Sequence, residues 1–355
     1  MYLITSFLSL HLGELLDILL LFNIVSVFFS GLNQLKQDNW RTQAYYYAKG
    51  TSRNVLSHIR QWMFFTVFFG LCSLPASTEG LILFAELMSL TSGYDHIKAV
   101  IGSIGFLHQI FDLPFERESF QLRLTLQSLK RKLSRAPLQA LPITIQHLKE
   151  MYRYVNLNNP EDLAIWCSIL VGFFGLLRKK NLVPEDLLDM DPTKILTVGN
   201  FVLDRDRGIA LVYIPFSKTN QFGQRNLVIP LVKNQCRALD PIYHLDLLFS
   251  RTEASHDFPA FSYKVGDRIR FVNYKSFTTK LKNLLSKAGF SPERFSGHSL
   301  RRGGATFLHA CGGSILQIQA CGDWQSSTWT KYIFISLEQR LLSQQLMSSN
   351  IPPDL

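Results

Sequence analysis

The hydrophobic pattern of this chain changes its period once, and that change limits the folds open to it. From about Tyr45 to Phe115, apolar residues recur at the spacing of helices. Residues 208–217 and 226–232 are instead rich in β-branched residues, and the polar segment 218–225 joins them, which is typical of a β-hairpin. Helical spacing returns from Pro241 onwards. The pattern predicts an α+β fold that is mainly helical and contains a small β-hairpin or sheet.

The length of the chain and the breaks in its pattern predict two domains. A chain of 355 residues is long for one ordinary core. Ile59, Trp62 and Phe65 lie at helical spacing and are expected in the core of a first domain of four or five helices. The predicted regions are an apolar leader (1–40), a helical domain (41–130), a basic linker broken by prolines (131–143), a domain with the hairpin (144–340) and a C-terminal tail (341–355).

The leader contains an uncharged run from Ile18 to Leu35, 18 residues long, which is close to the lower limit for a transmembrane helix. Asn23, Asn33 and Gln34 weaken its apolar character. No basic residue precedes the run, which argues against a signal peptide. A buried helix, a helix that docks on a partner, or a leader outside the working protein fits better than a membrane anchor, which is the minor alternative.

The chain is basic, with a formal net charge of +10 and an isoelectric point near 9.4. Residues 31–140 contribute +5 (12 Lys and Arg against 7 Asp and Glu), and residues 141–355 contribute +7 (25 against 18). Two basic bodies suit a protein that grips duplex DNA, whose phosphates attract Lys and Arg. Four basic residues near the linker are predicted to lie along DNA phosphates: Lys130, Arg131, Lys132 and Arg135. A solvated helix face is the alternative.

The sequence offers no pattern for a metal or a cofactor. The five cysteines are scattered and never closer than ten residues apart, which excludes metal-knuckle spacing and a disulfide framework and favours a reducing interior. The reactive residues described next have no acidic metal-ligand set beside them. We therefore expect neither a metal nor a cofactor.

Two motifs near the C-terminus contain residues that can react with a phosphodiester. Residues 297–306 read Gly-His-Ser-Leu-Arg-Arg-Gly-Gly-Ala-Thr and place His298 and Arg301 on one face of a helix. Tyr332 follows in another predicted helix and offers a hydroxyl nucleophile. Each has an ordinary alternative, because such His and Arg pairs arise by chance and an aromatic residue at helical spacing is often core.

Two residues upstream complete a characteristic order. Arg178 ends the predicted apolar helix 163–178, where a basic residue would also favour the helix carboxyl end, and Lys218 lies in the hairpin turn, where lysine is ordinary. The order of these residues resembles the catalytic set of the tyrosine recombinase (phage integrase) family. That order is an Arg after an apolar helix, a hairpin Lys, a His-x-x-Arg and a Tyr. The resemblance covers about 145–340, and the helical domain resembles the family's core-binding domain. The amino-acid sequences of these motifs are similar to those of family members encoded by eukaryotic mobile elements.

Two positions depart from the family pattern. Asn181 stands three residues after Arg178, where the family often has an acidic residue that could help to orient the arginine. The family's His or Trp usually lies nine residues before the tyrosine, where this chain has Asp323, while Trp324 lies eight before. Trp324 is favoured because an indole N–H can donate to a phosphate oxygen, whereas an aspartate would repel it. Asp323 stays the alternative.

The resemblance implies a role for each of these residues. Arg178 and Arg301 would hold the non-bridging oxygens of the phosphate, and His298 and Trp324 would add donors. Tyr332 would attack the phosphorus, with His298 as an acceptor of its proton, and Lys218 would protonate the leaving 5′ oxygen. Arg302, beside Arg301, is predicted to contact DNA.

The expected partner is double-stranded DNA, on which the family works as a homo-tetramer. The family passes a C-terminal segment to a neighbouring subunit, which the tail could do, although a frayed tail is equally consistent. The expected function is site-specific recombination or integration through a 3′-phosphotyrosyl intermediate, in the nucleus. One alternative is a DNA-binding protein that derives from a recombinase and has lost strand cleavage. Another is a membrane-associated helical protein, which would explain neither the hairpin nor the polar residues.

Overall fold

A computed structural model gives the fold of the chain. It describes residues 49–116, 119–134, 140–185, 191, 193–216, 227–324, 326–335, 341 and 344–345. The chain divides into two compact units, Met1–Pro137 and Leu138–Leu355. The predicted leader, the hairpin turn 218–225 and most of the predicted tail lie outside the described residues. In the described part, no helix has both the length and the apolar character to cross a membrane.

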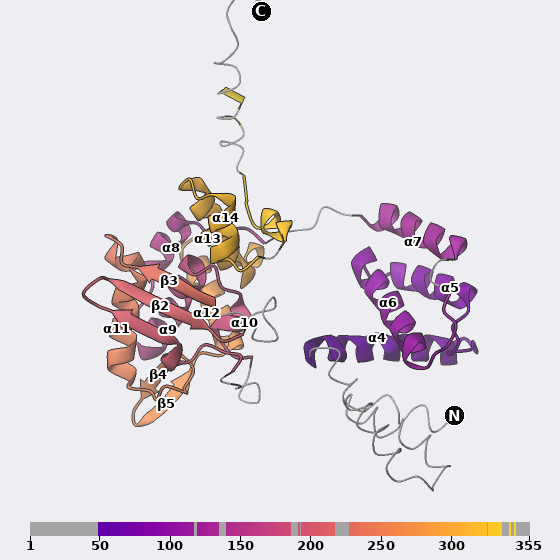
Figure 1. The fold of residues 1–355 in the computed structure, drawn as a ribbon, viewed down its shortest axis with the longest axis horizontal. Coiled ribbons are helices and arrows are strands. Elements are labelled where there is room, and N and C mark those ends of the chain that lie inside the picture. The colour runs from indigo at the N-terminus through magenta and orange to yellow at the C-terminus, as the bar shows by residue number, and fades with distance from the viewer. Residues whose placement is uncertain are drawn as a thin grey trace, which may run out of the picture. The chain divides into compact units, whose positions relative to one another are not determined.

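The first unit is built from helices: α4 (Lys49–Phe68), α5 (Thr78–Ser89), α6 (Tyr94–Ile110) and α7 (Phe120–Leu133), coloured indigo to magenta in Figure 1. The hydroxyl of Ser77 accepts a hydrogen bond from the Gly80 backbone N–H at 3.1 Å and so caps the start of α5. Ile59, Trp62 and Phe65 are buried, which confirms their predicted place in the core.

Helix α7 extends further than the sequence indicated. Lys130, Arg131 and Lys132 form its last turn, and the helix continues to Leu133, whereas the linker was expected to begin at residue 131. All three basic side chains are exposed. Their position is favourable because positive charge interacts well with the carboxyl end of a helix.

The second unit combines helices with two small β-structures. Its helices are α8 (Ile145–Tyr152), α9 (Pro160–Phe174), α10 (Lys179–Leu182), α11 (Pro241–Thr252), α12 (Tyr274–Lys287), α13 (His298–Ala310) and α14 (Ile315–Cys321). Short 3-10 turns lie at Val198–Asn200, Arg237–Leu239, Pro292–Arg294 and Ser327–Lys331. Its strands are β1 (Phe201–Asp204), β2 (Ile209–Ile214), β3 (Leu227–Val232), β4 (Ser262–Val265) and β5 (Arg268–Phe271). The predicted fold class, mainly helical with a small sheet, is confirmed.

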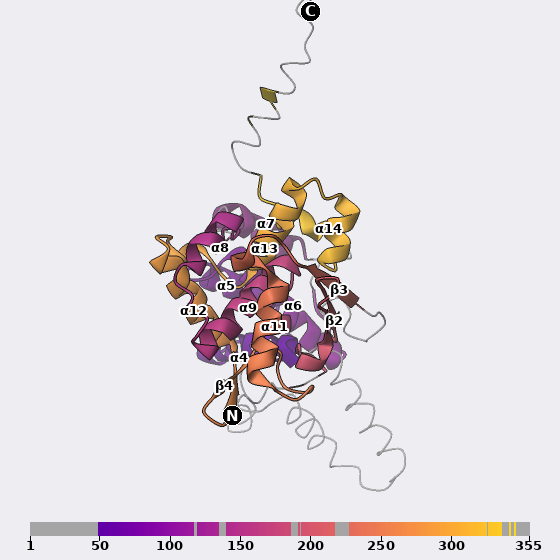
Figure 2. The same ribbon diagram turned by 90° about the vertical axis from the view of Figure 1, so that its left-hand side faces the viewer.

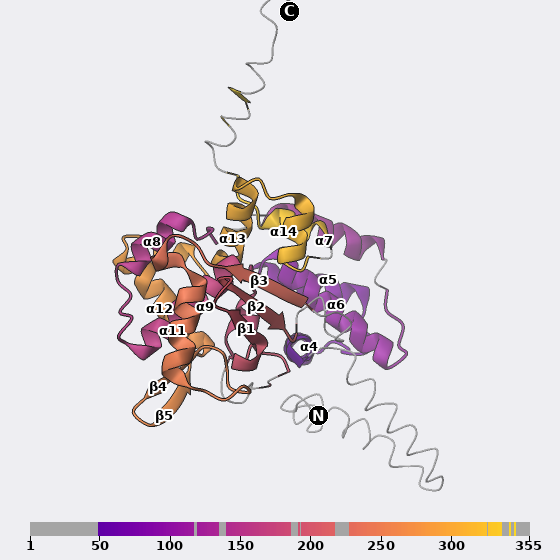
Figure 3. The same ribbon diagram turned by 60° about the vertical axis from the view of Figure 1, so that its left-hand side comes forward.

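The predicted hairpin is part of a three-stranded antiparallel sheet in the order β1-β2-β3 (Figure 3). Ile209 pairs with Val232 and Ile214 pairs with Leu227, so β2 and β3 are aligned along their whole length. Strand β1 was not predicted. Its four residues precede a polar turn and are too few to show an alternating pattern.

A second hairpin lies where the sequence indicated a loop, at residues 251–273. Strands β4 and β5 pair antiparallel, with Ser262 opposite Phe271. The turn between them uses Gly266, whose φ of 58° is in the left-handed region that glycine adopts without strain. Four-residue strands studded with Lys and Arg carry no hydrophobic run, which is why the pattern missed them.

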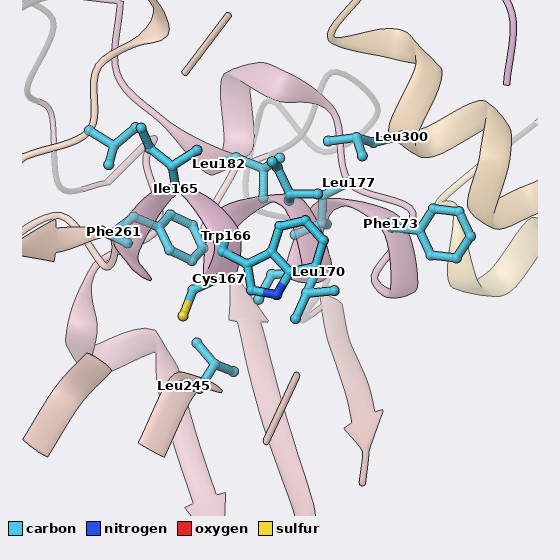
Figure 4. Close-up of a cluster of buried hydrophobic side chains, with 14 of the residues drawn as sticks. Ile165, Trp166, Cys167, Leu170, Phe173, Leu177, Leu182, Leu245, Phe261 and Leu300 are labelled. Carbon is cyan, nitrogen blue, oxygen red and sulfur yellow. The ribbon is translucent and has the colours of Figure 1, made fainter. Parts of the chain in front are cut away.

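Helix α9 is the centre of the second unit. It packs against α11, α13 and β4, and Figure 2 shows α9 and α11 side by side. Every residue from Asp162 to Phe173 is buried, so the helix is buried around its circumference rather than along one stripe. In the close-up of Figure 4, Trp166 and Leu170 of α9 lie in the same buried cluster as Phe261 and Leu300.

The end of α9 corrects the sequence prediction for Arg178. The helix was expected to continue to Arg178, but it ends at Phe174 with Gly175 as its C-cap. Leu176 then adopts a φ of 50°, which turns the chain out of the helix. Arg178 is the N-cap of the next short helix, α10, with extended backbone angles. Only Gly175 interrupts the apolar run from Phe173 to Leu177, so the hydrophobic pattern hid the break.

Candidate active site

Two glycines allow α13 to approach its neighbours closely. A Cβ atom on Gly303 would lie 1.8 Å from the carbonyl oxygen of Ile143, and one on Gly304 would lie 2.0 Å from that of Phe173. A side chain cannot be accommodated at these distances, so the glycine pair lets α13 pack directly on the end of α9 and on the chain before α8. This packing fixes the helix that carries Arg301 in its first turns.

Arg301 lies inside the protein and is held by main-chain carbonyls. Its residue is only 2% exposed. Nη1 donates a hydrogen bond to the carbonyl oxygen of Leu176, and Nη2 donates one to that of Gly322. A guanidinium group has five N–H donors, so these two bonds fix its plane and leave further donors for an anion. The turn at Leu176 therefore contributes to the site, because it directs the Leu176 carbonyl oxygen toward the Arg301 guanidinium group.

The ring of Trp324 covers the guanidinium group of Arg301, with Cζ 3.9 Å from the ring centroid. Trp324 is buried, and its indole nitrogen has no hydrogen-bond partner among the described residues. A buried N–H without an acceptor is costly, so this donor is suited to an anionic ligand. Asp323 is also buried, and its charge opposes the burial and the Arg178 charge that lower the pKa of Arg301 to about 9. Of the two alternatives for the His or Trp position, Trp324 offers the donor.

Tyr332 packs against the same group. Its ring centroid lies 5.0 Å from that of Trp324, and the Cζ of Arg301 lies 5.3 Å from the Tyr332 ring. The backbone around the tyrosine is tied to α13, because the Thr306 hydroxyl donates to the Tyr332 carbonyl at 3.2 Å and accepts from the Phe334 N–H at 3.1 Å. Tyr332 itself is half-buried.

The helix expected at residues 328–346 differs from what is observed around Tyr332. A 3-10 turn covers Ser327–Lys331, and Tyr332 follows as its C-cap. Residues 333–335 have no regular secondary structure, and residues 336–340 lie outside the described part. The two bonds of the Thr306 hydroxyl satisfy backbone groups here that a continuing helix would have bonded within itself.

Arg178 and His298 lie near Arg301 and form the more open side of the group. Burial is the largest cause that lowers the pKa of Arg301, and the positive charge of Arg178 comes next. His298 is the first residue of α13 and is exposed at the surface. Partial desolvation of its ring lowers the pKa of His298, and the charges of Lys179, Arg301 and Arg178 lower it further. The two arginines and the histidine therefore lie close enough for their charges to interact.

Asn181 stands at the position where the family often has a carboxylate, and it makes a hydrogen bond that a carboxylate could not make. It is buried, and its Nδ2 donates to the carbonyl oxygen of Phe216 at 2.5 Å. A carboxylate cannot donate this bond. Phe216 is the last described residue before the segment with Lys218, which lies outside the described residues. The predicted role of Lys218 stays a prediction.

The predicted DNA-contacting residues differ in their surroundings. Arg302 is half-buried, and its Nη1 donates to the carbonyl oxygen of Ala140 at 2.9 Å, which anchors the start of the second unit. Burial lowers the pKa of Arg302. The three basic residues of α7 are exposed, and Arg135 lies outside the described residues. Their contact with DNA stays a prediction.

Sequence reasoning missed two residues at this site, Lys179 and Tyr274. Lys179 Nζ donates a hydrogen bond to the Tyr274 hydroxyl at 2.6 Å. This bond is the largest cause that lowers the pKa of Tyr274. Lys179 follows Arg178 directly, which could have drawn attention to it. Nothing in the sequence signals that Tyr274, on another helix, lies beside it.

The described group can bind and activate an anion. It brings together two guanidinium groups, an imidazole, an unpaired indole N–H and a phenol hydroxyl. Fixed donors of this kind stabilise the charge that develops on the oxygens of a phosphodiester under attack. Within the described residues, no group of three or more His, Cys, Asp or Glu side chains is placed to hold a metal ion.

Comparison with solved structures shows which fold this is. The XerH site-specific recombinase bound to a palindromic difH substrate, in a post-cleavage complex, aligns with a TM-score of 0.54 and 11% identity over 88% of this chain and 84% of the other. A segment of the Tn1549 transposon integrase in complex with circular intermediate DNA aligns with a TM-score of 0.50 and 12% identity over 95% and 99%. A lambda integrase dimer bound to a COC′ core site aligns with a TM-score of 0.50 and 14% identity, over 81% of this chain and 89% of the integrase chain.

These structural neighbours are tyrosine recombinases and integrases, so the chain has the fold of that class. All three were determined with DNA. No family model matches the sequence, and no curated protein matches it either. The likeness is therefore one of structure, at low sequence identity.

Proposed function

We propose that this protein is a site-specific DNA recombinase or integrase that cuts and rejoins strands through a 3′-phosphotyrosyl intermediate. The observation that carries the proposal is the stack of Arg301, Trp324 and Tyr332, three side chains that the fold gathers at one buried guanidinium group. Order in the sequence alone gives no reason for these rings and this charge to meet. Their meeting supports a site built around a phosphate.

The chemistry follows from the donors around the phosphate. Arg178 and Arg301 would hold the non-bridging oxygens, and the free indole N–H of Trp324 would donate to one of them. The oxygen of Tyr332 would attack phosphorus while His298 takes its proton. The 5′ oxygen would leave as a hydroxyl with a proton from Lys218, and a phosphotyrosyl ester would remain on the 3′ side. One ester replaces another, so the reverse attack needs no external energy source.

The proposed substrate is double-stranded DNA, in line with the DNA complexes of the structural neighbours. The exposed last turn of α7 would contact backbone phosphates. We extend the proposal to a homo-tetramer on two duplexes, with the tail exchanged between subunits, by analogy with the family. The nucleus as the place of action, and a mobile element as the source, rest on the resemblance of the motifs to eukaryotic versions.

The test is covalent trapping on a nicked suicide substrate that contains the protein's own target, selected from a random duplex library. Wild-type protein should form a denaturant-resistant adduct, and Tyr332→Phe should form none while its gel-shift affinity stays within about twofold, because the hydroxyl contributes to chemistry rather than to affinity. An adduct with the variant would show that another residue is the nucleophile.

The second candidate is a DNA-binding protein without cleavage. The half-buried Arg302 and the exposed basic turn of α7 would serve it equally well. Wild-type protein that binds a selected duplex but never traps it would favour this candidate. The unpaired indole N–H of Trp324 favours the recombinase, because a protein that only binds DNA has no need of a buried donor without a partner.

A further inference from the structure

Lys179 is restrained at both ends of its side chain, which is unusual for a lysine beside a cationic site. Its ammonium group donates to the Tyr274 hydroxyl at 2.6 Å and lies 3.8 Å from the centroid of the Tyr274 ring. Its methylene chain passes over Gly297, where an added Cβ would lie 2.9 Å from Lys179 Cδ. The side chain therefore loses the freedom that lysine normally keeps at a surface.

The restrained side chain lies against the residue before His298, and its charge acts on the His298 imidazole. Gly297 directly precedes His298, the first residue of α13, and Lys179 is the first residue of α10, directly after its N-cap Arg178. The charged groups that act on His298 are Lys179, Arg301 and Arg178. Tyr274 bonds to Lys179, and the charge of Glu185 acts on Tyr274; neither is among the groups that shift the pKa of His298.

We infer that the Lys179–Tyr274 pair is a positioning element of the active site: Tyr274 holds the Lys179 ammonium beside His298, so that the imidazole stays neutral and can accept a proton. This inference rests on the proposed function for the identity of the proton, which is that of Tyr332. In this scheme the Lys179 ammonium touches neither Tyr332 nor the phosphate. It acts through His298.

The physical reason is the repulsion between two positive charges. A protonated imidazole cannot accept a proton, and an ammonium group held nearby makes protonation of His298 less favourable. The lowered pKa of His298 agrees in direction. A mobile lysine would move its charge into solvent and lose the effect. The hydrogen bond to Tyr274 prevents this.

The experiment is a histidine titration by NMR on the full chain labelled with ¹³C-histidine, with the His298→Gln variant identifying the signal. Lys179→Met should raise the pKa of His298, and Tyr274→Phe should raise it by less, because the ring remains while the anchoring hydroxyl is lost. Lys179→Arg should restore the wild-type titration. The matched control is Lys180→Met, since Lys180 is the next residue and its exposed side chain pairs with Glu185 at 3.1 Å. It should leave His298 unchanged.

A second readout is the pH profile of covalent trapping. Because a neutral His298 is needed, the rate rises as pH passes through the pKa of His298, and a higher pKa moves this acid limb to higher pH. In Lys179→Met, the ratio of the initial rates at pH 6 and pH 8 should fall about threefold, and in Lys180→Met it should not change.

The outcomes separate this inference from the proposed function. If Lys179→Met and Tyr274→Phe both fold and both leave the titration of His298 unchanged, the inference is overturned, whether or not DNA is trapped. If the wild type never traps DNA while Lys179→Met still raises the pKa of His298, the proposed function fails and the placement of the charge stands. If Lys179→Met does not fold, the comparison of Tyr274→Phe with Lys180→Met decides.

Discussion

Arg301 and Arg178 carry the same guanidinium group, but the protein holds them in different ways. Arg301 is buried, bonded to the carbonyls of Leu176 and Gly322, and covered by the Trp324 ring. Arg178 is half-buried and is the N-cap of α10, a helix of only four residues. One side of the candidate site is thus built into the core, and the other lies on a short turn near the surface.

The difference suggests a division of labour between the two sides. The buried side, with Arg301, Trp324 and Tyr332, would be preorganised before DNA binds, so that little reorganisation is needed during the reaction. The open side, with Arg178 and His298, would close on the phosphate when DNA arrives. Substitution of the buried Arg301 should therefore affect folding and chemistry together, and substitution of Arg178 should affect chemistry alone.

The largest effects are expected when each of the two arginines is replaced with lysine. Arg301→Lys and Arg178→Lys should each lower the rate of covalent trapping by about 10²-fold or more, because lysine cannot bond two phosphate oxygens as a fork. Only Arg301→Lys should also lower the free energy of unfolding, by about 3 kcal/mol, since it leaves two buried carbonyls without their donors. Urea unfolding measures the second effect. Equal stability of the two variants would contradict the division.

Substitutions of Trp324 can distinguish two contributions of its side chain: the stacking of the ring on Arg301 and the hydrogen bond that the indole N–H can donate. Trp324→Phe keeps an aromatic face over Arg301 but removes the N–H, so trapping should fall by about 10²-fold. Trp324→His keeps a donor and should fall by less. Single-turnover trapping rates of the two variants give the comparison. If both variants lose the same activity, the indole contributes packing and not a hydrogen bond.

The glycine pair tests whether the packing of α13 supports the buried side. Gly303→Ala would place a Cβ atom 1.8 Å from the Ile143 carbonyl oxygen, so α13 must shift, at a cost of about 1–3 kcal/mol in unfolding free energy. The matched control is Gly102→Ala in α6, where an added Cβ meets no atom within 4 Å. That change should stabilise the protein by up to about 1 kcal/mol. Thermal unfolding of both variants shows whether the signs are opposite, as expected.

The smallest expected effect is at Asn181, a buried residue in α10, the helix that follows Arg178. Asn181→Asp replaces the amide that donates to Phe216 with an acceptor, which should cost about 1–2 kcal/mol of unfolding free energy. We also expect trapping to fall several-fold, because the chain that leads to Lys218 loses this bond. Unfolding and trapping assays of the variant measure both. A variant that is as stable and active as wild type would show that the bond to Phe216 has no role.

Much of the fold was predictable because its signals are local. The hydrophobic runs of β2 and β3 and the helical spacing of α12 depend on neighbouring residues only. The sequence missed β1, β4 and β5 because four-residue strands carry too short a pattern. It also extended α9 to Arg178, although Gly175 follows the last helical residue, because the bend at Leu176 depends on packing and on the bond to Arg301.

The candidate site was predictable as a set of residues but not as an arrangement. The order of Arg178, His298, Arg301 and Tyr332 can be read along the chain, whereas the burial of Arg301 cannot. A positive charge is rarely expected in the interior, and the carbonyls of Leu176 and Gly322 and the ring of Trp324 explain it here. The pairing of Lys179 with Tyr274 likewise depends on contact between two helices.

The most direct test of the account is to locate the covalent bond itself. The trapped complex would be digested with nuclease and trypsin, and the peptide that begins at Tyr332, after cleavage at Lys331, would be sequenced by mass spectrometry. The account predicts that this peptide carries a 3′-linked nucleotide phosphate on the oxygen of Tyr332. A nucleotide attached to any other residue, with Tyr332 unmodified, would contradict it.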